Sequence, residues 1–133
     1  MIAAVADTHV ALWYLLRNPR LSGPARNFID HTAAEGDEIA LSPISLAEIV
    51  YLTEKNRLPV EVYDELRKAP ADPGFVIEEA PFTSAIVDAM RLVPRSDIPD
   101  MPDRIVAATA VYFGVPVISC DGRIRASNIR TIW

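Results

Sequence analysis

Four acidic residues occur where an apolar run gives way to the start of a helix. They lie in the stretches AVADTHVAL, LSPISLAEI, DMPDRIV and ISCDGRI, and are Asp7, Glu48, Asp103 and Asp121. Carboxylates that crowd together raise one another's pKa values, which costs stability unless a cation compensates the charge. Oxygen ligands without a histidine or cysteine cluster favour Mg²⁺ or Mn²⁺ over zinc. The set therefore predicts a divalent-metal site of the kind that hydrolyses phosphodiester bonds.

Helix capping is the alternative explanation for these acids. The positions that match a helix N-cap or a capping box are Asp7, Asp121, Ser45 with Glu48, and Asp100 with Asp103. Serine, threonine or asparagine would cap a helix equally well, yet the chain uses a carboxylate at all four places. We therefore favour the metal interpretation for the four acids together. Asp97, three residues before Asp100, is interpreted as a solvated loop acid.

The elements that must bring these acids together alternate between strands and helices. Strands are expected at 2–6, 38–41, 75–81, 115–120 and, at an edge, 129–133. Helices are expected at 9–17, 25–36, 46–57, 59–69, 83–93 and 104–114, two of them closed by Gly36 and Gly114. Strands that are almost continuously apolar predict a parallel sheet covered by helices on both faces. Acids that follow such strands then meet along one edge of the sheet.

Composition limits the classes of protein to which the chain can belong. Its 133 residues predict one domain, 1–133, and a net charge of −5 argues against a duplex-DNA binder with a broad basic face. The N-terminus lacks the basic segment of a signal peptide, and no apolar run is long enough to span a membrane. The single cysteine, Cys120, excludes an internal disulfide and is expected to be an inert thiol buried at a strand end. We expect a soluble cytoplasmic protein.

Several other residues near the acids have two possible roles. Thr8 either orients water or a ligand carboxylate through its hydroxyl or caps the helix, and His9 is interpreted as a surface or helix-start residue rather than a general base. Trp13 and Tyr14 are read as core or interface aromatics rather than base-stacking ones. The arginines close to the third and fourth acids either bind phosphates or form salt bridges, and the sequence favours neither; they are Arg104, Arg123 and Arg125.

The order and spacing of these motifs resemble the PIN-domain ribonucleases, closely the toxin subunits of VapBC toxin–antitoxin systems. The matching stretches are ADTHVALWYL, LSPISLAEI, DMPDRIVAATA, VISCDGRI and the closing IRTIW. The resemblance implies a three-layer α/β/α fold around a mainly parallel sheet and cleavage of RNA with Mg²⁺ or Mn²⁺. It makes Asp7, Glu48, Asp103 and Asp121 the metal and catalytic acids. Asp100 matches an additional acid of the family and, like Thr8, would support the site from behind the ligands.

The resemblance also implies partners, namely a homodimer and a cognate antitoxin. Helices 9–17 and 46–57 carry more large apolar residues than one buried stripe absorbs: Trp13, Leu16, Val50, Tyr51 and Leu52. Such a surface suits the amphipathic segment of an antitoxin, although a homodimer interface is the alternative.

Two other classes of function are weighed against the ribonuclease. A catalytically inactive PIN-like module that only binds a protein is disfavoured because all four acids are present. An acid-pocket phosphotransfer domain fits poorly, because VISCDGRI has no following lysine and His9 stands where a second aspartate would be needed.

Overall fold

Strand β1 (Ile2–Ala6) lies at the centre of a parallel sheet in the computed structural model, which describes residues 1–68 and 74–133. The five strands found in the described residues run in the order β3-β2-β1-β4-β5. The others are β2 (Glu38–Leu41), β3 (Ile77–Glu79), β4 (Val117–Ile118) and β5 (Thr131–Ile132). All four pairings are parallel, and β5 forms an edge as expected.

Side chains of the central strands alternate between two apolar cores. Ala4 and Ala6 of β1 pack in one core with Ile39, whereas Val5 packs in the other with Val117. This alternation follows from the two-residue repeat of a strand, and both sets are buried because helices cover both faces. The expected parallel sheet with apolar residues on both faces is therefore confirmed.

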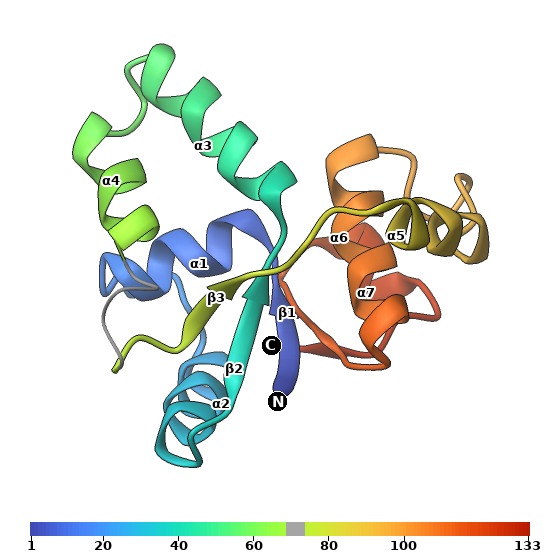
Figure 1. Ribbon diagram of the computed structural model, residues 1–133, viewed down its shortest axis with the longest axis horizontal. Helices are drawn as coiled ribbons and strands as arrows, with labels where there is room; N and C mark the ends of the chain where they lie inside the picture. The colour runs from blue at the N-terminus through green and yellow to red at the C-terminus, as the bar shows by residue number, and fades with distance from the viewer. Residues whose placement is uncertain (69–73) are drawn as a thin grey trace.

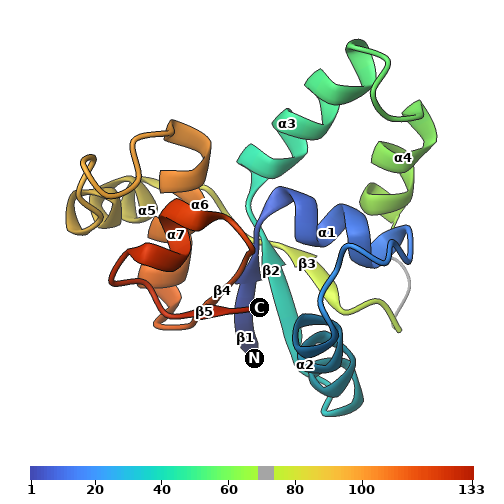
Figure 2. The same ribbon diagram turned by 180° about the vertical axis from the view of Figure 1, so that it is seen from behind.

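Helices form the two outer layers, as Figures 1 and 2 show from opposite sides. One face is covered by α1 (Thr8–Leu15), α2 (Gly23–Ala34), α3 (Pro43–Glu54) and α4 (Val60–Lys68). The other is covered by α5 (Ser84–Ala89), a 3-10 turn (Met90–Leu92), α6 (Met101–Phe113) and α7 (Gly122–Ala126). The predicted three-layer α/β/α fold is confirmed.

Strand register determines which residues share the carboxyl edge of the sheet. Ala6, the last residue of β1, pairs with Leu41 of β2 and with Ile118 of β4. The segments that follow these residues therefore leave the sheet side by side, and α1 and α3 begin next to each other there (Figure 1). The chain thus brings the residues after 6, 41 and 118 to one place.

Local signals explain where the helices near this edge begin and end. Helix α3 starts at Pro43, and the Ser42 side chain accepts a hydrogen bond from the backbone N–H of Ile44 at 3.2 Å. The alternative explanation of Ser45 and Glu48 as a capping box is wrong, because the helix starts earlier, with Ser42 as its N-cap and proline at its first position. Gly114 closes α6 in the left-handed conformation (φ 68°), as predicted.

Other boundaries differ from expectation in smaller ways. The helix start expected after Asp121 is confirmed by α7, although its five residues are too few for a helical repeat to give its length from the sequence. The helix expected over 83–93 is divided into α5 and the 3-10 turn, and the end of the helix expected over 59–69 reaches residue 69, outside the described residues.

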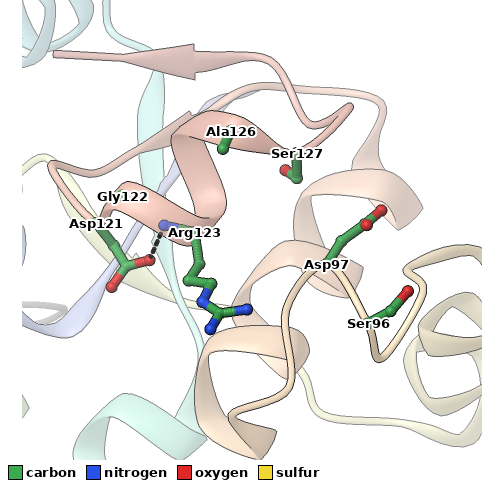
Figure 3. Close-up of a pocket in the computed structure, with 7 residues that line it drawn as sticks. All are labelled: Ser96, Asp97, Asp121, Gly122, Arg123, Ala126 and Ser127. Atoms are coloured by element: carbon green, nitrogen blue, oxygen red, sulfur yellow. Dashed lines mark hydrogen bonds between the residues drawn. The ribbon is translucent and has the colours of Figure 1, made fainter.

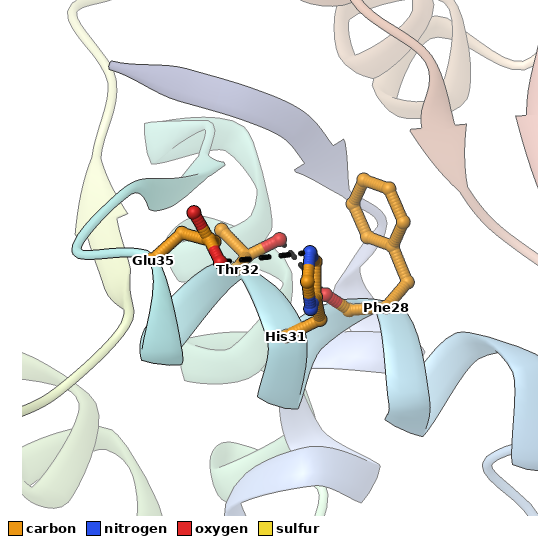
Figure 4. Close-up of polar contacts among 4 residues, drawn as sticks. All are labelled: Phe28, His31, Thr32 and Glu35. Atoms are coloured by element: carbon orange, nitrogen blue, oxygen red, sulfur yellow. Dashed lines mark hydrogen bonds and ion pairs between the residues drawn. The ribbon is translucent and has the colours of Figure 1, made fainter.

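The outer surface of α2 carries polar contacts away from the carboxyl edge (Figure 4). His31 Nε2 lies 3.9 Å from Glu35 Oε1, and both side chains are exposed. The buried Thr32 hydroxyl donates to the Phe28 carbonyl oxygen at 2.8 Å, one turn earlier in the helix. His31 is therefore a surface residue. None of the helices in the described part of the chain is long and apolar enough to cross a membrane.

Candidate active site

The four predicted acids line one cavity at the carboxyl edge of the sheet. The cavity has a volume of about 460 Å³ and is lined by Asp7, Thr8, His9, Trp13, Arg20, Glu48, Asp100, Asp103, Cys120 and Asp121. Both residues predicted to support the acids, Thr8 and Asp100, are among them. Residues up to 114 positions apart in the sequence thus share one surface, because the parallel topology returns each strand to the same edge.

Asp7 is the most deeply placed acid and directly follows β1. Its Oδ1 accepts a hydrogen bond from the Val10 backbone N–H at 2.9 Å, so it also caps α1. Its Oδ2 accepts a hydrogen bond from the Ser119 hydroxyl. Burial raises the pKa of Asp7, and the hydrogen bonds from Ser119 and Val10 oppose this rise. Capping and a place in the acid cavity are therefore compatible at this position.

Glu48 reaches the cavity from the second turn of α3 and is held by Thr8. The buried Thr8 hydroxyl donates to Glu48 Oε1 at 2.6 Å, and its oxygen lies 2.9 Å from Ser45 Oγ. Because a hydroxyl has one proton and the carboxylate only accepts, the Thr8 proton belongs to the bond with Glu48. Thr8 therefore orients the Glu48 carboxylate, whereas Asp7 is the residue that caps α1.

Asp100 and Asp103 stand at the start of α6. Asp100 is the N-cap, and its Oδ2 accepts a hydrogen bond from the Asp103 backbone N–H at 3.1 Å. This bond uses only the backbone of Asp103, and the Asp103 side chain lines the cavity. Burial, together with the charges of Asp100, Asp121, Glu48 and Asp7, raises the pKa of Asp103 to about 7. The alanine-rich face of α6 is buried, as expected, at Ala107, Ala108 and Ala110.

Asp121 follows β4 and caps the short helix α7. Its Oδ1 accepts hydrogen bonds from the backbone N–H groups of Arg123 and Ile124 at 2.9 and 3.0 Å. Its own N–H donates to Ser119 Oγ at 3.0 Å. Ser119 therefore connects the first and fourth acids, Asp7 and Asp121. Sequence reasoning did not select Ser119, although its position directly after a strand was the available signal.

The donor set suits a hard dication bound partly through water. Across the described ranges, 1–68 and 74–133, no three Asp, Glu, His or Cys side chains form a ready-made set of metal ligands. Mg²⁺ commonly uses one or two protein carboxylates and retains several waters, so a smaller direct ligand set remains consistent with the site. The oxygen-rich lining and the mutual repulsion that raises the pKa of Asp103 both favour such an ion.

Cys120 contradicts the expectation of a buried thiol at a strand end. It is exposed and lines the acid cavity, because β4 ends at Ile118 and the chain turns outward before α7. Partial burial and the negative charge of Asp7 raise the pKa of its thiol, so the sulfur is held in the protonated form. His9, Trp13 and Arg20 also line the cavity; Arg20 gave no signal in the sequence.

A second cavity adjoins the first at Asp121. It has a volume of about 560 Å³, and Figure 3 shows its lining residues, with Arg123 on α7 and Asp97 on the loop before α6. Asp97 lies outside the acid cavity, in agreement with its interpretation as a loop acid. Arg104 lies at neither site, because its guanidinium donates to the carbonyl oxygens of Val93 at 2.8 Å and Met90 at 2.9 Å. Its role is to hold the 3-10 turn against α6.

A parallel α/β sheet with acids gathered at its carboxyl edge defines a class of protein, and comparison with known families places the chain within it. A family model described as PIN domain matches residues 4–128. The chain belongs to the PIN-domain family. Ribonuclease VapC22 of Mycobacterium tuberculosis (strain ATCC 25618 / H37Rv) is 29% identical to it over 138 residues, covering 100% of both proteins.

Solved structures of similar fold cover nearly the whole chain. VapBC2 from Rickettsia felis, bound to a DNA fragment from its promoter, has a chain that matches with a TM-score of 0.71 and 17% identity, over 98% of this chain and 97% of that one. A toxin–antitoxin complex from Klebsiella pneumoniae matches with a TM-score of 0.65 and 20% identity, covering 98% and 97%. FitAcB from Neisseria gonorrhoeae matches with a TM-score of 0.62 and 23% identity, covering 98% and 96%. These likenesses support the fold.

Proposed function

We propose that this chain is an endoribonuclease dependent on Mg²⁺ or Mn²⁺ and the toxin of a toxin–antitoxin pair. The observation that carries the proposal is the convergence of Asp7, Glu48, Asp103 and Asp121 on one cavity. A relative that matches over its full length bears the name ribonuclease, and the fold recurs in VapBC2 and in a second toxin–antitoxin complex. A module that only binds protein would not need acids placed at this energetic cost.

The roles of the acids follow from the contacts that hold them. Asp7 and Asp103 would hold the ion, with Glu48 and Asp121 completing the site through direct contact or through water. When bound, a divalent ion would lower the pKa of an attacking water and balance the negative charge that develops on the scissile phosphate. Asp7 is fixed by the Ser119 hydroxyl and the Val10 N–H, so its geometry does not depend on substrate.

Glu48 and Asp121 are suited to orient the attacking water. One oxygen of each already accepts hydrogen bonds, from Thr8 to Glu48 Oε1 and from two backbone N–H groups to Asp121 Oδ1. Within the described residues, Glu48 Oε2 and Asp121 Oδ2 accept no hydrogen bond and are available for the water proton. As the water oxygen bonds to phosphorus, the bond from phosphorus to one ribose oxygen breaks. The carboxylate takes up the water proton, and the departing ribose oxygen receives a proton from solvent.

Two partners belong to the same proposal. Leu16, Val50 and Tyr51 on the α1–α3 side are exposed at 48%, 36% and 68%, which leaves an apolar surface for a segment of a VapB-like antitoxin. Trp13 and Leu52 are instead partly buried against the core. A second apolar surface surrounds Leu92 and Tyr112 on the opposite layer and suits the homodimer.

The experiment that tests the function maps cleavage positions on total cellular RNA. Purified wild-type protein should cut RNA at defined positions with Mg²⁺ or Mn²⁺ and should stop cutting in EDTA. Asp7→Asn should give no cuts above background under the same conditions. Robust cleavage after removal of every divalent ion would overturn the metal mechanism, and the absence of any cleavage would favour the inactive binding module.

A further inference from the structure

One wall of the acid cavity has a chemistry different from the carboxylates. His9 and Trp13 lie one turn apart on α1, Arg20 lies in the loop before α2, and all three line the cavity. We propose that this His9–Trp13–Arg20 wall binds one nucleotide of single-stranded RNA next to the scissile phosphate. The base would stack on the rings, and the guanidinium would contact the adjoining phosphate. The inference rests on the ribonuclease function proposed above and names how its substrate is held.

The ring of Trp13 contacts both the ring of His9, which also lines the cavity, and the ring of Trp133. The centroids of His9 and Trp13 lie 5.6 Å apart at an interplanar angle of 47°, and those of Trp13 and Trp133 lie 6.0 Å apart at 53°. Trp13 and Trp133 pack against the buried core, which limits their movement, whereas His9 is exposed. Nucleobases stack on such aromatic surfaces with little dependence on sequence. The wall therefore offers a preformed site for an unpaired base.

Arg20 provides the matching contact for a phosphate. Among the described residues that line the acid cavity, it is the one lysine or arginine, beside five carboxylates. Among the ion pairs of the described residues, none involves Arg20. Its backbone N–H donates to Asn18 Oδ1 at 2.9 Å, and the next residue, Leu21, is buried, so the loop that carries it is anchored. An anchored arginine that forms no ion pair with the nearby acids is available for an anionic ligand. Its planar guanidinium can donate two parallel hydrogen bonds to phosphate oxygens.

A single strand fits this wall better than a duplex. A base can stack on a protein side chain only when it is not already stacked between its neighbours in a duplex. Binding of a duplex regardless of sequence instead relies on a broad basic surface. The chain carries a net charge of −5, so such a surface is not supplied by its composition. Contacts on one phosphate and one base next to the acids instead position the strand locally.

Binding of a single-stranded RNA of about ten nucleotides tests the inference in the full chain. The parent is Asp103→Asn, which prevents cleavage in Mg²⁺, and affinity is measured by anisotropy of a labelled strand. We expect saturable quenching of tryptophan emission by the single strand and none by the duplex of the same sequence. His9→Ala and Arg20→Gln should each weaken binding about tenfold. The matched variants His31→Ala and Arg57→Gln, on exposed sites away from the acid cavity, should bind like the parent.

Several outcomes would overturn the inference. These are an absence of RNA binding, unchanged tryptophan emission on binding, or equal affinities of His9→Ala, Arg20→Gln and their matched controls. Loss of a co-purified small protein partner in Arg20→Gln, with unchanged RNA affinity, would assign the wall to a protein contact. Cleavage by the wild-type chain is measured separately: cleavage without wall-dependent binding would refute only this inference, and wall-dependent binding without cleavage would refute only the nuclease.

Discussion

The hydroxyl of Thr8 donates a hydrogen bond to Glu48 Oε1 at 2.6 Å, across forty positions of sequence. Thr8 begins α1 and Glu48 lies within α3, so this contact connects two helices that leave neighbouring strands. The buried hydroxyl orients the carboxylate and leaves its other oxygen for the cavity. Thr8, which we do not assign to the reaction, therefore fixes the position of Glu48, which we do assign to it.

Replacing Thr8 tests this positioning role. Thr8→Val keeps the shape of the side chain and removes the donor, so RNA cleavage should fall by roughly 10- to 100-fold, as when other supporting contacts of metal sites are lost. Thr8→Ser retains the donor and should restore most of the activity. Single-turnover cleavage rates and Mg²⁺ titrations of both variants are the measurements. Equal rates for the valine and serine variants would show that the hydrogen bond does not matter.

Removing an acid should separate activity from stability. Asp103→Asn should lower the cleavage rate by at least about 100-fold, more than the loss of a supporting contact. It should maintain or raise the unfolding temperature of the metal-free protein, because one source of like-charge repulsion disappears. Cleavage assays and thermal unfolding in EDTA measure the two effects, with Asp88→Asn on α5 as control. An active but unfolding-prone Asp103→Asn would mean that Asp103 serves the helix rather than the reaction.

The raised pKa of Asp103 predicts a pH dependence of stability in the metal-free protein. Its carboxyl has a pKa of about 7 when folded, compared with an ordinary value of 3.8. Between these values the folded state binds more protons, so the free energy of unfolding increases as the pH falls from above 7 towards 4. Because Asp103 is only partly buried, the gain should be on the order of 1 kcal/mol.

Urea unfolding at several pH values in EDTA measures this dependence. Asp103→Asn should exceed wild type in stability above pH 7 and converge with it near pH 4, since the difference isolates this carboxyl. A constant difference between the two proteins over this range would contradict the assignment of the raised pKa to Asp103.

Metal binding should stabilise the fold through the same acids. Mg²⁺ or Mn²⁺ at a hundred times its dissociation constant contributes about 2.7 kcal/mol, which raises the unfolding temperature by several degrees in a chain of this size. Differential scanning calorimetry should show this shift in wild type and a much smaller one in Asp7→Asn. The same shift in both proteins would place the ion elsewhere.

Much of the site was predictable from the sequence because the order of strands and helices determines which residues meet. Apolar strands followed by acids predicted a parallel sheet, and a parallel sheet necessarily gathers the residues after Ala6 and Ile118 at one edge. The helix closed by Gly114 and its buried alanine face also follow from local patterns, since left-handed glycine and small residues have distinctive positions. These inferences need the order of elements along the chain and their spacing, which the sequence contains.

The remaining features depend on packing between distant segments. Cys120 is exposed because the chain leaves the sheet after β4. Ser119 connects Asp7 to Asp121 because Ala6 at the end of β1 is in register with Ile118 at the end of β4. Arg20 reaches the acids only through the path of a loop. Hydrophobic periodicity reports which face of an element is buried, but it carries no information on the partner that buries it or on the direction in which a loop returns.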